Sequence, residues 1–198
     1  MVKSEPGAAG RRQRIVAAAA DVLVEAGLRE ATTRAVTERA GVGTGLLNHY
    51  FRWPELRAEA WAGLFATVAD RLFPADAEPD ERLEAYFRDA FAADAQPYWH
   101  LWSEAVDLAA GDADMARVLG EAQRRLHAGL AGALADGADA GLWRLADADA
   151  TALRLEALYD GLAGLLLSGV ADLDAEAAER HLRTAFRLEC ALDTPGAG

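Results

Sequence analysis

The side chains best suited to chemistry gather in two regions, one polar and one aromatic. The polar region places Asn48, His49 and Tyr50 directly before Phe51 and Arg52. An amide can hydrogen-bond the edge of a base, and basic or hydroxyl side chains can bind phosphate oxygens. In the aromatic region, tryptophan, phenylalanine and tyrosine recur over the following hundred residues. Aromatic side chains commonly line pockets for small molecules.

Three helices separated by glycines are expected around the polar region. Apolar residues recur every three or four positions over 11–26, and a glycine follows. A short second helix, 33–40, can be N-capped by Thr32 and ended by Gly41. A third, 44–50, follows after a turn of only three residues. Two short helices joined by a tight glycine turn form a helix-turn-helix, whose second helix enters the major groove of DNA.

The rest of the chain is also predicted to be helical, because no alternating apolar and polar run favours a strand. Pro54 suits the first turn of a long helix that reaches Leu72. Glycines and prolines predict the later breaks, one of them at 137–141. Further helices are expected at about 80–93, 96–110, 112–135, 149–169 and 175–191.

Charge and cysteine content narrow the class of protein. The net charge is −12, but residues 1–52 carry +3 and the remainder −15. A basic end on an acidic body orients such a molecule toward a phosphate backbone. Cys190 is alone, so no intramolecular disulfide is possible, and no signal peptide or membrane-length apolar run is present. We therefore expect a cytoplasmic protein without a membrane partner.

The segment from Thr32 to Phe51, within residues 11–60, resembles the tetracycline-repressor (TetR) family of bacterial regulators. The run 45–51, Gly-Leu-Leu-Asn-His-Tyr-Phe, is most similar to the choline-responsive branch, although so short a run does not transfer an effector. Pro54 stands where the family usually has a phosphate-binding Lys, so Arg52 or Arg57 would replace it. The resemblance implies that Phe51 packs beneath the reading helix. With Arg52 added, the predicted DNA-binding residues are Thr33, Arg34, Thr44, Gly45, Asn48, His49, Tyr50 and Arg52.

An effector pocket is predicted from the aromatic region, with Tyr98 and Met115 as further fillers. His100 and Glu104 lie four residues apart on one helical face and could orient a ligand. Such a pair could also bind a metal or act as acid and base, but no third ligand accompanies it, so we expect neither metal nor cofactor. The alternative is that the aromatic residues form an ordinary core. The candidates are Trp61, Phe65, Phe87, Phe91, Trp99, His100, Trp102, Glu104, Trp143 and Tyr159.

A dimer interface is predicted on the last two helices, which carry apolar stripes. Gly161 and Gly164 would let another helix approach closely. Two helices from each subunit would form a four-helix interface, which is also the arrangement implied by the resemblance. Alternatively, the stripes pack within one subunit. The predicted interface residues are Leu158, Leu162, Leu165, Leu166, Leu182 and Phe186.

The sequence therefore predicts an all-α, homodimeric, ligand-responsive repressor rather than an enzyme. Its partners would be a near-palindromic double-stranded operator and a small-molecule effector. The alternative is a helical small-molecule-binding protein or enzyme with no role on DNA. The predicted parts are a disordered arm (1–10), a helix-turn-helix domain (11–53), an effector-binding and dimerisation domain (54–193) and a disordered tail (194–198).

Overall fold

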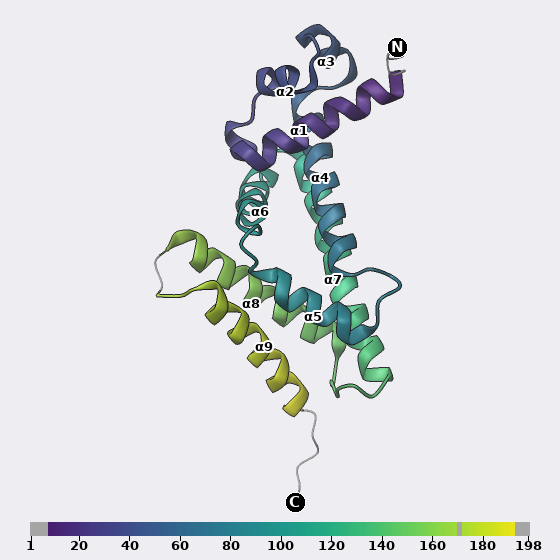
Figure 1. The fold of residues 1–198 in the computed structure, drawn as a ribbon, viewed down its shortest axis with the longest axis vertical. Helices are drawn as coiled ribbons and strands as arrows, with labels where there is room; N and C mark the ends of the chain where they lie inside the picture. Colours follow the sequence, from purple (N-terminus) through teal and green to yellow (C-terminus); the bar gives the residue numbers. More distant parts are fainter. Residues whose placement is uncertain (1–7, 170–171, 193–198) are drawn as a thin grey trace, which may run out of the picture. The chain divides into compact units, whose positions relative to one another are not determined.

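The computed structural model describes residues 8–169 and 172–192, and within these ranges all regular secondary structure is helical (Figure 1). The predicted all-α class is confirmed, and most helices begin and end within three residues of their expected positions. The described helices are α1 (Ala8–Glu30), α2 (Thr33–Ala40), α3 (Thr44–Tyr50), α4 (Trp53–Leu72), α5 (Pro79–Ala90), α6 (Gln96–Ala109), α7 (Ala113–Asp139), α8 (Ala148–Ser168) and α9 (Ala175–Leu192).

The helices form two compact units, each with its own core. The first comprises Met1–Ala66 and His100–Ala122, and the second comprises Thr67–Trp99 and Gln123–Gly198. Helices α4, α6 and α7 each contribute a segment to both. The buried side chains of the first unit come from α1 to α4, the second half of α6 and the start of α7, and include Ile15, Leu23, Leu47, Leu56, Trp61, Leu101 and Met115.

Helix α1 bends where the sequence predicts its end. Gly27 adopts φ 82° and ψ 171°, a conformation that favours glycine, and the chain resumes a helical path to Glu30. A Cβ atom at this position would also lie 2.9 Å from a carboxylate oxygen of Glu104. The backbone conformation therefore requires glycine, and a side chain here would also displace the Glu104 carboxylate.

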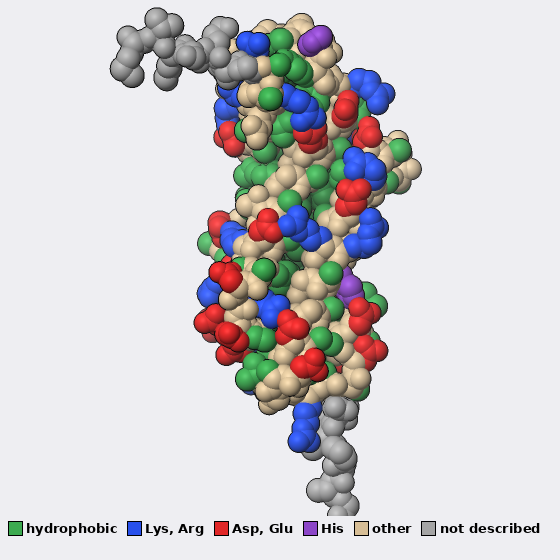
Figure 2. Space-filling view, turned by 90° about the vertical axis from the view of Figure 1, so that its right-hand side faces the viewer, with side chains coloured by type: hydrophobic (Ala, Val, Ile, Leu, Met, Phe, Trp, Pro, Cys, Tyr) green, Lys and Arg blue, Asp and Glu red, His purple; other side chains and the backbone are tan. Residues whose placement is uncertain are grey.

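The second unit is built around one apolar cluster from α5, α7, α8 and α9. Leu130, Leu134, Leu155 and Leu182 are at most 1% exposed. Partly buried aromatic residues, including Trp99, Trp143 and Tyr159, pack against this cluster. On the face drawn in Figure 2, acidic side chains are frequent over this unit, in keeping with the negative charge of the later sequence.

The predicted break at 137–141 begins too early. Helix α7 continues through Gly137 to Asp139, and the left-handed residue is Gly141, with φ 74°. Gly137 is needed for packing, because a Cβ there would lie 2.0 Å from the Trp143 ring. Spacing along the sequence does not reveal this contact.

The structure describes the two ends of the chain only in part. Helix α1 begins at Ala8, so positions 8–10 of the predicted arm are helical. Positions 1–7 and the predicted tail, 194–198, lie outside the described residues. Among the helices that the structure does describe, none is both long enough and apolar enough to cross a bilayer.

Candidate nucleic-acid interface and effector site

Local capping fixes the angle between α2 and α3. The Thr32 hydroxyl accepts a hydrogen bond from Ala35 N–H at 3.2 Å and begins α2. Gly41 ends the helix at φ 64° and ψ 40°, and the next residue, Val42, donates its N–H to Thr37 O at 3.0 Å. Gly43 is the N-cap of α3, and its carbonyl accepts the first bonds of that helix.

Helix α3 is anchored on one side and exposed on the other. Leu47 is fully buried and holds the helix against the unit. Thr44, Asn48 and His49 are exposed, and Tyr50 is half-buried with its ring edge-on to that of His49 at 5.3 Å. The face of α3 opposite Leu47 is therefore open to solvent.

An aromatic and ionic contact holds the end of α3 to α1 and α4. Phe51 is buried, and the Arg12 guanidinium lies over its ring at 4.6 Å. The same guanidinium donates to both carboxylate oxygens of Glu59 at 2.7 and 2.5 Å. This bidentate pair raises the pKa of Arg12. Arg12 is therefore a positioning residue that the sequence analysis missed, because its partners lie 39 and 47 positions away.

The basic residues near α3 differ in their availability to phosphate. Arg34 is exposed, but its Nε donates to Glu38 at 2.8 Å. Arg52 is exposed, and no ion pair of its side chain is found among the described residues. Arg57 forms an ion pair with Asp112 at 2.7 Å, with each side chain 14% exposed. Of the two arginines considered as a replacement for the missing lysine, Arg57 is thus committed elsewhere and Arg52 is free.

Glu104, predicted to bind the effector, serves α1 instead. Its carboxylate accepts the N–H of Leu28 at 2.6 Å, directly after the bend at Gly27. Asp107, one turn later on α6, pairs with Arg29. His100, the expected companion of Glu104, is exposed. His100 and Glu104 do lie four residues apart on α6, but the Glu104 carboxylate holds α6 to the end of α1.

The predicted effector residues divide into three groups. Trp61, Phe65 and Trp102 belong to the first unit, where their ring centroids lie 4.2 to 5.6 Å apart. Trp61 is fully buried and donates its indole N–H to Leu101 O at 3.1 Å. Trp61 therefore has the satisfied polar atom expected of a core residue.

The second group, in the second unit, is an aromatic cluster of Tyr86, Phe91, Trp99 and Tyr159. Phe91 lies 5.9 Å from Trp99 and 5.5 Å from Tyr159, and Tyr86 lies 6.3 Å from Tyr159. Burial raises the pKa of both tyrosines. Tyr86 was absent from the sequence prediction, although it directly precedes the predicted Phe87 on α5.

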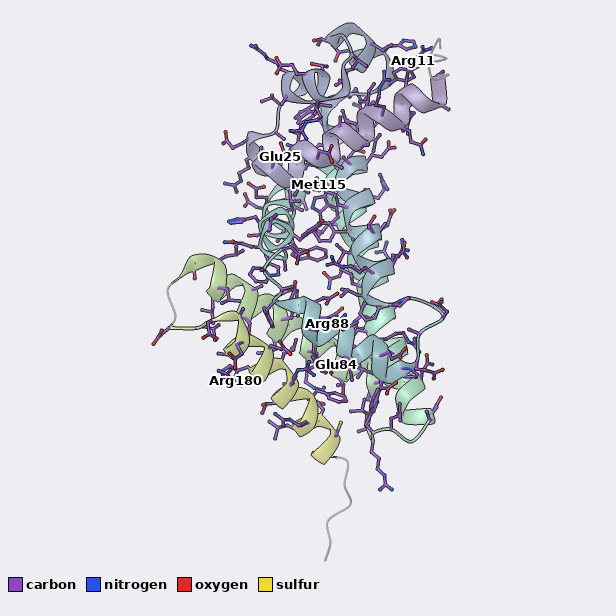
Figure 3. The ribbon with its side chains drawn as sticks, in the orientation of Figure 1. Arg11, Glu25, Glu84, Arg88, Met115 and Arg180 are labelled. Carbon is purple, nitrogen blue, oxygen red and sulfur yellow. The ribbon has the colours of Figure 1, made fainter. Side chains whose placement is uncertain are left out.

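The third group lies at a surface pocket of about 360 Å³ between α5, α9 and the residues that follow α7. Phe87 and Trp143 line it together with Phe186, which contacts both rings at 5.7 and 5.5 Å. Arg183 also lines the pocket: its guanidinium lies over Phe87 and binds Glu84, which projects from α5 (Figure 3). A second arginine, Arg187, lines the pocket and is exposed.

His127, on α7, is held between two carboxylates of α8. His127 Nδ1 lies 2.8 Å from Glu156 and Nε2 lies 3.0 Å from Asp149. These hydrogen bonds raise the pKa of His127. Burial raises the pKa of Glu156, and the nearby histidine opposes that rise. Across the residues described, no group of three His, Cys, Asp or Glu side chains is arranged to hold a metal ion.

The predicted dimer residues vary in exposure. Leu162 and Leu182 are 7% and 0% exposed and belong to the core of the second unit, so little of their surface is left for a partner. Leu158, Leu166 and Phe186 are partly buried against that core. The exposed large apolar side chains on the last two helices are Leu153, Leu165 and Leu188.

A three-helix unit that anchors a short third helix by one leucine and exposes its polar face belongs to the helix-turn-helix class of DNA-binding proteins. Two family models agree with this class. Bacterial regulatory proteins of the tetR family match residues 15–52, and the C-terminal domain of BetI-type transcriptional repressors matches residues 79–191. The chain belongs to the TetR family of bacterial transcriptional regulators, with a C-terminal domain of the BetI type.

Individual proteins resemble this chain along nearly its whole length, in sequence or in fold. The HTH-type transcriptional regulator BetI of Burkholderia ambifaria is 30% identical over 184 residues, which cover 86% of this chain and 90% of that protein. A transcriptional regulator from Pseudomonas aeruginosa PAO1 superposes with a TM-score of 0.73 at 25% identity, covering 95% and 94% of the two chains. A regulator from Saccharomonospora viridis, solved in complex with choline, gives a TM-score of 0.75 at 20% identity, covering 90% and 96%.

Proposed function

We propose that this regulator is a repressor that binds a near-palindromic operator as a two-fold dimer and is released by a small organic cation. The observation that carries the DNA part is the geometry of α3. Its polar residues Asn48 and His49 are exposed, and the capped turn and buried Leu47 hold the helix in place. A short rigid helix of this kind fits the major groove.

The roles on DNA follow from side-chain chemistry. Asn48 suits a bidentate contact to adenine, whereas Arg52 suits phosphate. Thr33, which is half-buried, and exposed Thr44 stand in the first turns of α2 and α3, where hydroxyls and backbone N–H groups can meet phosphate oxygens. Gly45, Tyr50 and Arg34 complete the proposed contact surface, with Arg34 exchanging its bond to Glu38 for one to phosphate.

Dimerisation is proposed through the exposed sides of α8 and α9. Leu153 and Leu165 are 61% and 42% exposed on α8, and Leu188 is 61% exposed on α9. On α8, Gly161 and Gly164 lie between the two leucines, and a Cβ at either glycine would meet nothing within 4 Å. Packing within the subunit therefore does not require these glycines, and a helix of the second subunit could approach closely there.

The effector site is proposed at the aromatic cluster of the second unit. The faces of Phe91, Trp99 and Tyr159 attract cations, and the half-buried Glu156 adds negative charge close to Tyr86. The choline complex of the Saccharomonospora viridis regulator makes a quaternary ammonium ion a natural first probe.

Release requires only that the effector bind one conformation more tightly than the other. Helix α6 carries one residue of the aromatic cluster, Trp99, in its first turn and later carries Glu104, which is bonded to Leu28 of α1. A ligand that reorients α6 would therefore alter the support of α1, against which α2 packs.

The DNA proposal is tested by gel shift with the intergenic region upstream of the gene. Retardation that weakens steeply with salt is expected. Asn48→Ala should relax sequence preference, and Arg52→Gln should weaken binding to all sequences alike. Equal loss of selectivity in both variants would contradict these roles, and no retardation at low salt would contradict the proposal itself.

The dimer and effector proposals have separate tests. Gly164→Glu should shift the protein to monomer in sedimentation equilibrium, because its side chain fits the isolated subunit but not a close helix pair. Choline should raise the thermal midpoint of the wild-type protein and release the operator. An unchanged dimer in the first test, or operator binding unaffected by small ammonium ions in the second, would refute that part.

A further inference from the structure

A surface pocket of the second unit has no role in the functions proposed above. It encloses about 360 Å³ between α5, α9 and the residues that follow α7, at the small end of the roughly 300–1,000 Å³ typical of ligand sites. None of its lining residues belongs to the aromatic cluster of Tyr86, Phe91, Trp99 and Tyr159. A ligand held here would therefore occupy a different site from the proposed effector.

One side of the pocket is apolar and built from aromatic rings. Phe186 lies 5.7 Å from Phe87 and meets the ring of Trp143 edge-on at 5.5 Å. Trp143 donates its indole N–H to Leu134 O at 2.8 Å, so its only donor is already used. These rings can therefore contact an apolar or aromatic group of a ligand, but they offer it no conventional hydrogen bond.

Two of the four charged residues of the pocket neutralise each other. Arg183 donates to both carboxylate oxygens of Glu84 at 2.7 and 2.5 Å, and its Nε donates to Glu179 at 2.7 Å. Because this guanidinium already binds two carboxylates, neither Arg183 nor Glu84, which Figure 3 labels, is a strong partner for a ligand.

The other two charged residues, Asp80 and Arg187, lie one turn further along their helices. Asp80 stands four positions before Glu84 on α5, and Arg187 stands four positions after Arg183 on α9. Helices α5 and α9 contact each other and run in roughly opposite directions (Figure 1). Asp80 and Arg187 therefore lie at the same end of the pocket, one on each helix.

Both residues are exposed and have hydrogen-bonding capacity left. Asp80 Oδ1 accepts the N–H of Glu81, and Arg187 Nη2 donates to Thr184 Oγ1, each at 3.0 Å. With the residues that the structure describes, neither forms an ion pair, although both line one pocket. A carboxylate and a guanidinium that stand apart in one pocket suit a ligand carrying both an ammonium group and a carboxylate. A ligand with only one of these charges would leave one of the two residues without a partner.

We infer that this pocket binds a free amino acid with an apolar or aromatic side chain. Asp80 accepts hydrogen bonds from the ammonium group, Arg187 donates to the carboxylate, and the side chain contacts Trp143 and Phe186. A free amino acid carries both charges on one carbon atom, whereas a residue within a polypeptide carries neither. The inference does not depend on the effector proposed for the aromatic cluster.

The test is calorimetric titration of the purified full-length protein with L-phenylalanine, with its aliphatic counterpart L-leucine, and with probes that lack one part of the ligand. Phenethylamine lacks the carboxylate, and hydrocinnamate lacks the ammonium group. L-Phenylalanine should bind about 10-fold more tightly than either, the range expected for hydrogen bonds to one charged group. Glycine keeps both charges without a side chain and should also bind about 10-fold more weakly. N-acetyl-L-phenylalanine amide lacks both charges and represents a residue within a peptide, so it should bind most weakly.

The variants Asp80→Asn and Arg187→Gln assign each charge of the ligand to one residue. Arg187→Gln should weaken L-phenylalanine binding about 10-fold and leave phenethylamine binding unchanged. Asp80→Asn should weaken L-phenylalanine binding equally and leave hydrocinnamate binding unchanged. The matched controls, Glu81→Gln and Arg180→Gln, remove the same charges from exposed positions of the same helices that do not line the pocket. Both controls should bind L-phenylalanine like the wild type.

Four results would overturn the inference. If the wild-type protein binds neither L-phenylalanine nor L-leucine, the pocket is not an amino-acid site, and the proposed regulator and its cationic effector are unaffected. Equal affinity for L-phenylalanine and its N-acetyl amide would assign the pocket to a peptide instead. Full L-phenylalanine affinity in both Asp80→Asn and Arg187→Gln would place the ligand elsewhere. An equal loss in Arg180→Gln and Arg187→Gln would show that overall charge controls binding.

Discussion

Replacing Asp112 by Asn is expected to lower the free energy of unfolding by about 2–4 kcal/mol. Asp112 and Arg57 form an ion pair at 2.7 Å with each side chain 14% exposed, and Arg57 Nε is buried without a hydrogen-bond partner. The Asn amide keeps the shape and an oxygen that can still accept the N–H of Met115 at the start of α7. Only the negative charge is lost, which leaves the guanidinium unpaired in a largely buried position.

Two further variants separate the charge from the cap. Asp112→Ala also removes the acceptor for Met115 N–H, at an additional cost of about 1 kcal/mol. Arg57→Met removes the cation. Combined with Asp112→Asn, it should recover part of the loss, because no unpaired charge then remains buried.

The assay is urea denaturation at fixed protein concentration, read as the midpoint and slope of the transition. For a chain of this size, the loss corresponds to a fall of about 5–15 °C in thermal midpoint. Burial opposes ionisation of Asp112, but the Met115 N–H and the Arg57 guanidinium outweigh it and lower its pKa. The stabilisation is therefore full above the unfolded-state pKa and disappears as pH falls through the folded-state pKa. A loss below about 0.5 kcal/mol at neutral pH would show that the pair behaves like a solvated surface pair.

Three other substitutions test local features. Gly41→Ala should lower the free energy of unfolding by about 1 kcal/mol, because φ at Gly41 is 64°. Gly43→Ala should lower it less, because φ at Gly43 is −77° and a Cβ there would meet nothing. Equal urea midpoints of the two variants would contradict the capping argument. His127→Gln should reduce the thermal midpoint more at pH 6 than at pH 9. The pKa of His127 is raised in the folded state, so its protonation stabilises the fold fully below the unfolded-state pKa, and this stabilisation disappears as the pH rises through the folded-state pKa. Gly137→Ala should destabilise the protein by about 1–3 kcal/mol through overlap with the Trp143 ring; urea titration with an unchanged midpoint would argue against this packing.

Local chemistry explains why the helix-turn-helix was predictable from sequence. The Thr32 cap, the left-handed Gly41 and the buried Leu47 all depend on neighbours within a few residues, and all three occur as expected. The start of α4 at Trp53 also follows from the adjacent proline.

Contacts between distant residues were not predictable in the same way. The pattern shows that Glu104 shares a face with His100, but not that the N–H of Leu28, 76 positions earlier, would donate to its carboxylate. Aromatic residues could be counted, yet nothing in their spacing separates Trp61, in the core of the first unit, from Trp99, in the aromatic cluster of the second. Likewise, an apolar stripe does not distinguish Leu182, which is fully buried, from Leu188, which is exposed.

The pairing of arginines within the first unit bears on how strongly ionic strength controls operator affinity. Arg12, Arg29 and Arg39 each bind a carboxylate there, and of the paired arginines only Arg34 is proposed to exchange its carboxylate for a phosphate. Counterion release should then follow Arg34 and the uncommitted guanidiniums, chiefly Arg14 and Arg52, rather than all basic residues. For the proposed dimer that gives a slope of roughly −5 in a plot of log affinity against log salt, a moderate dependence that leaves base contacts a large share of discrimination.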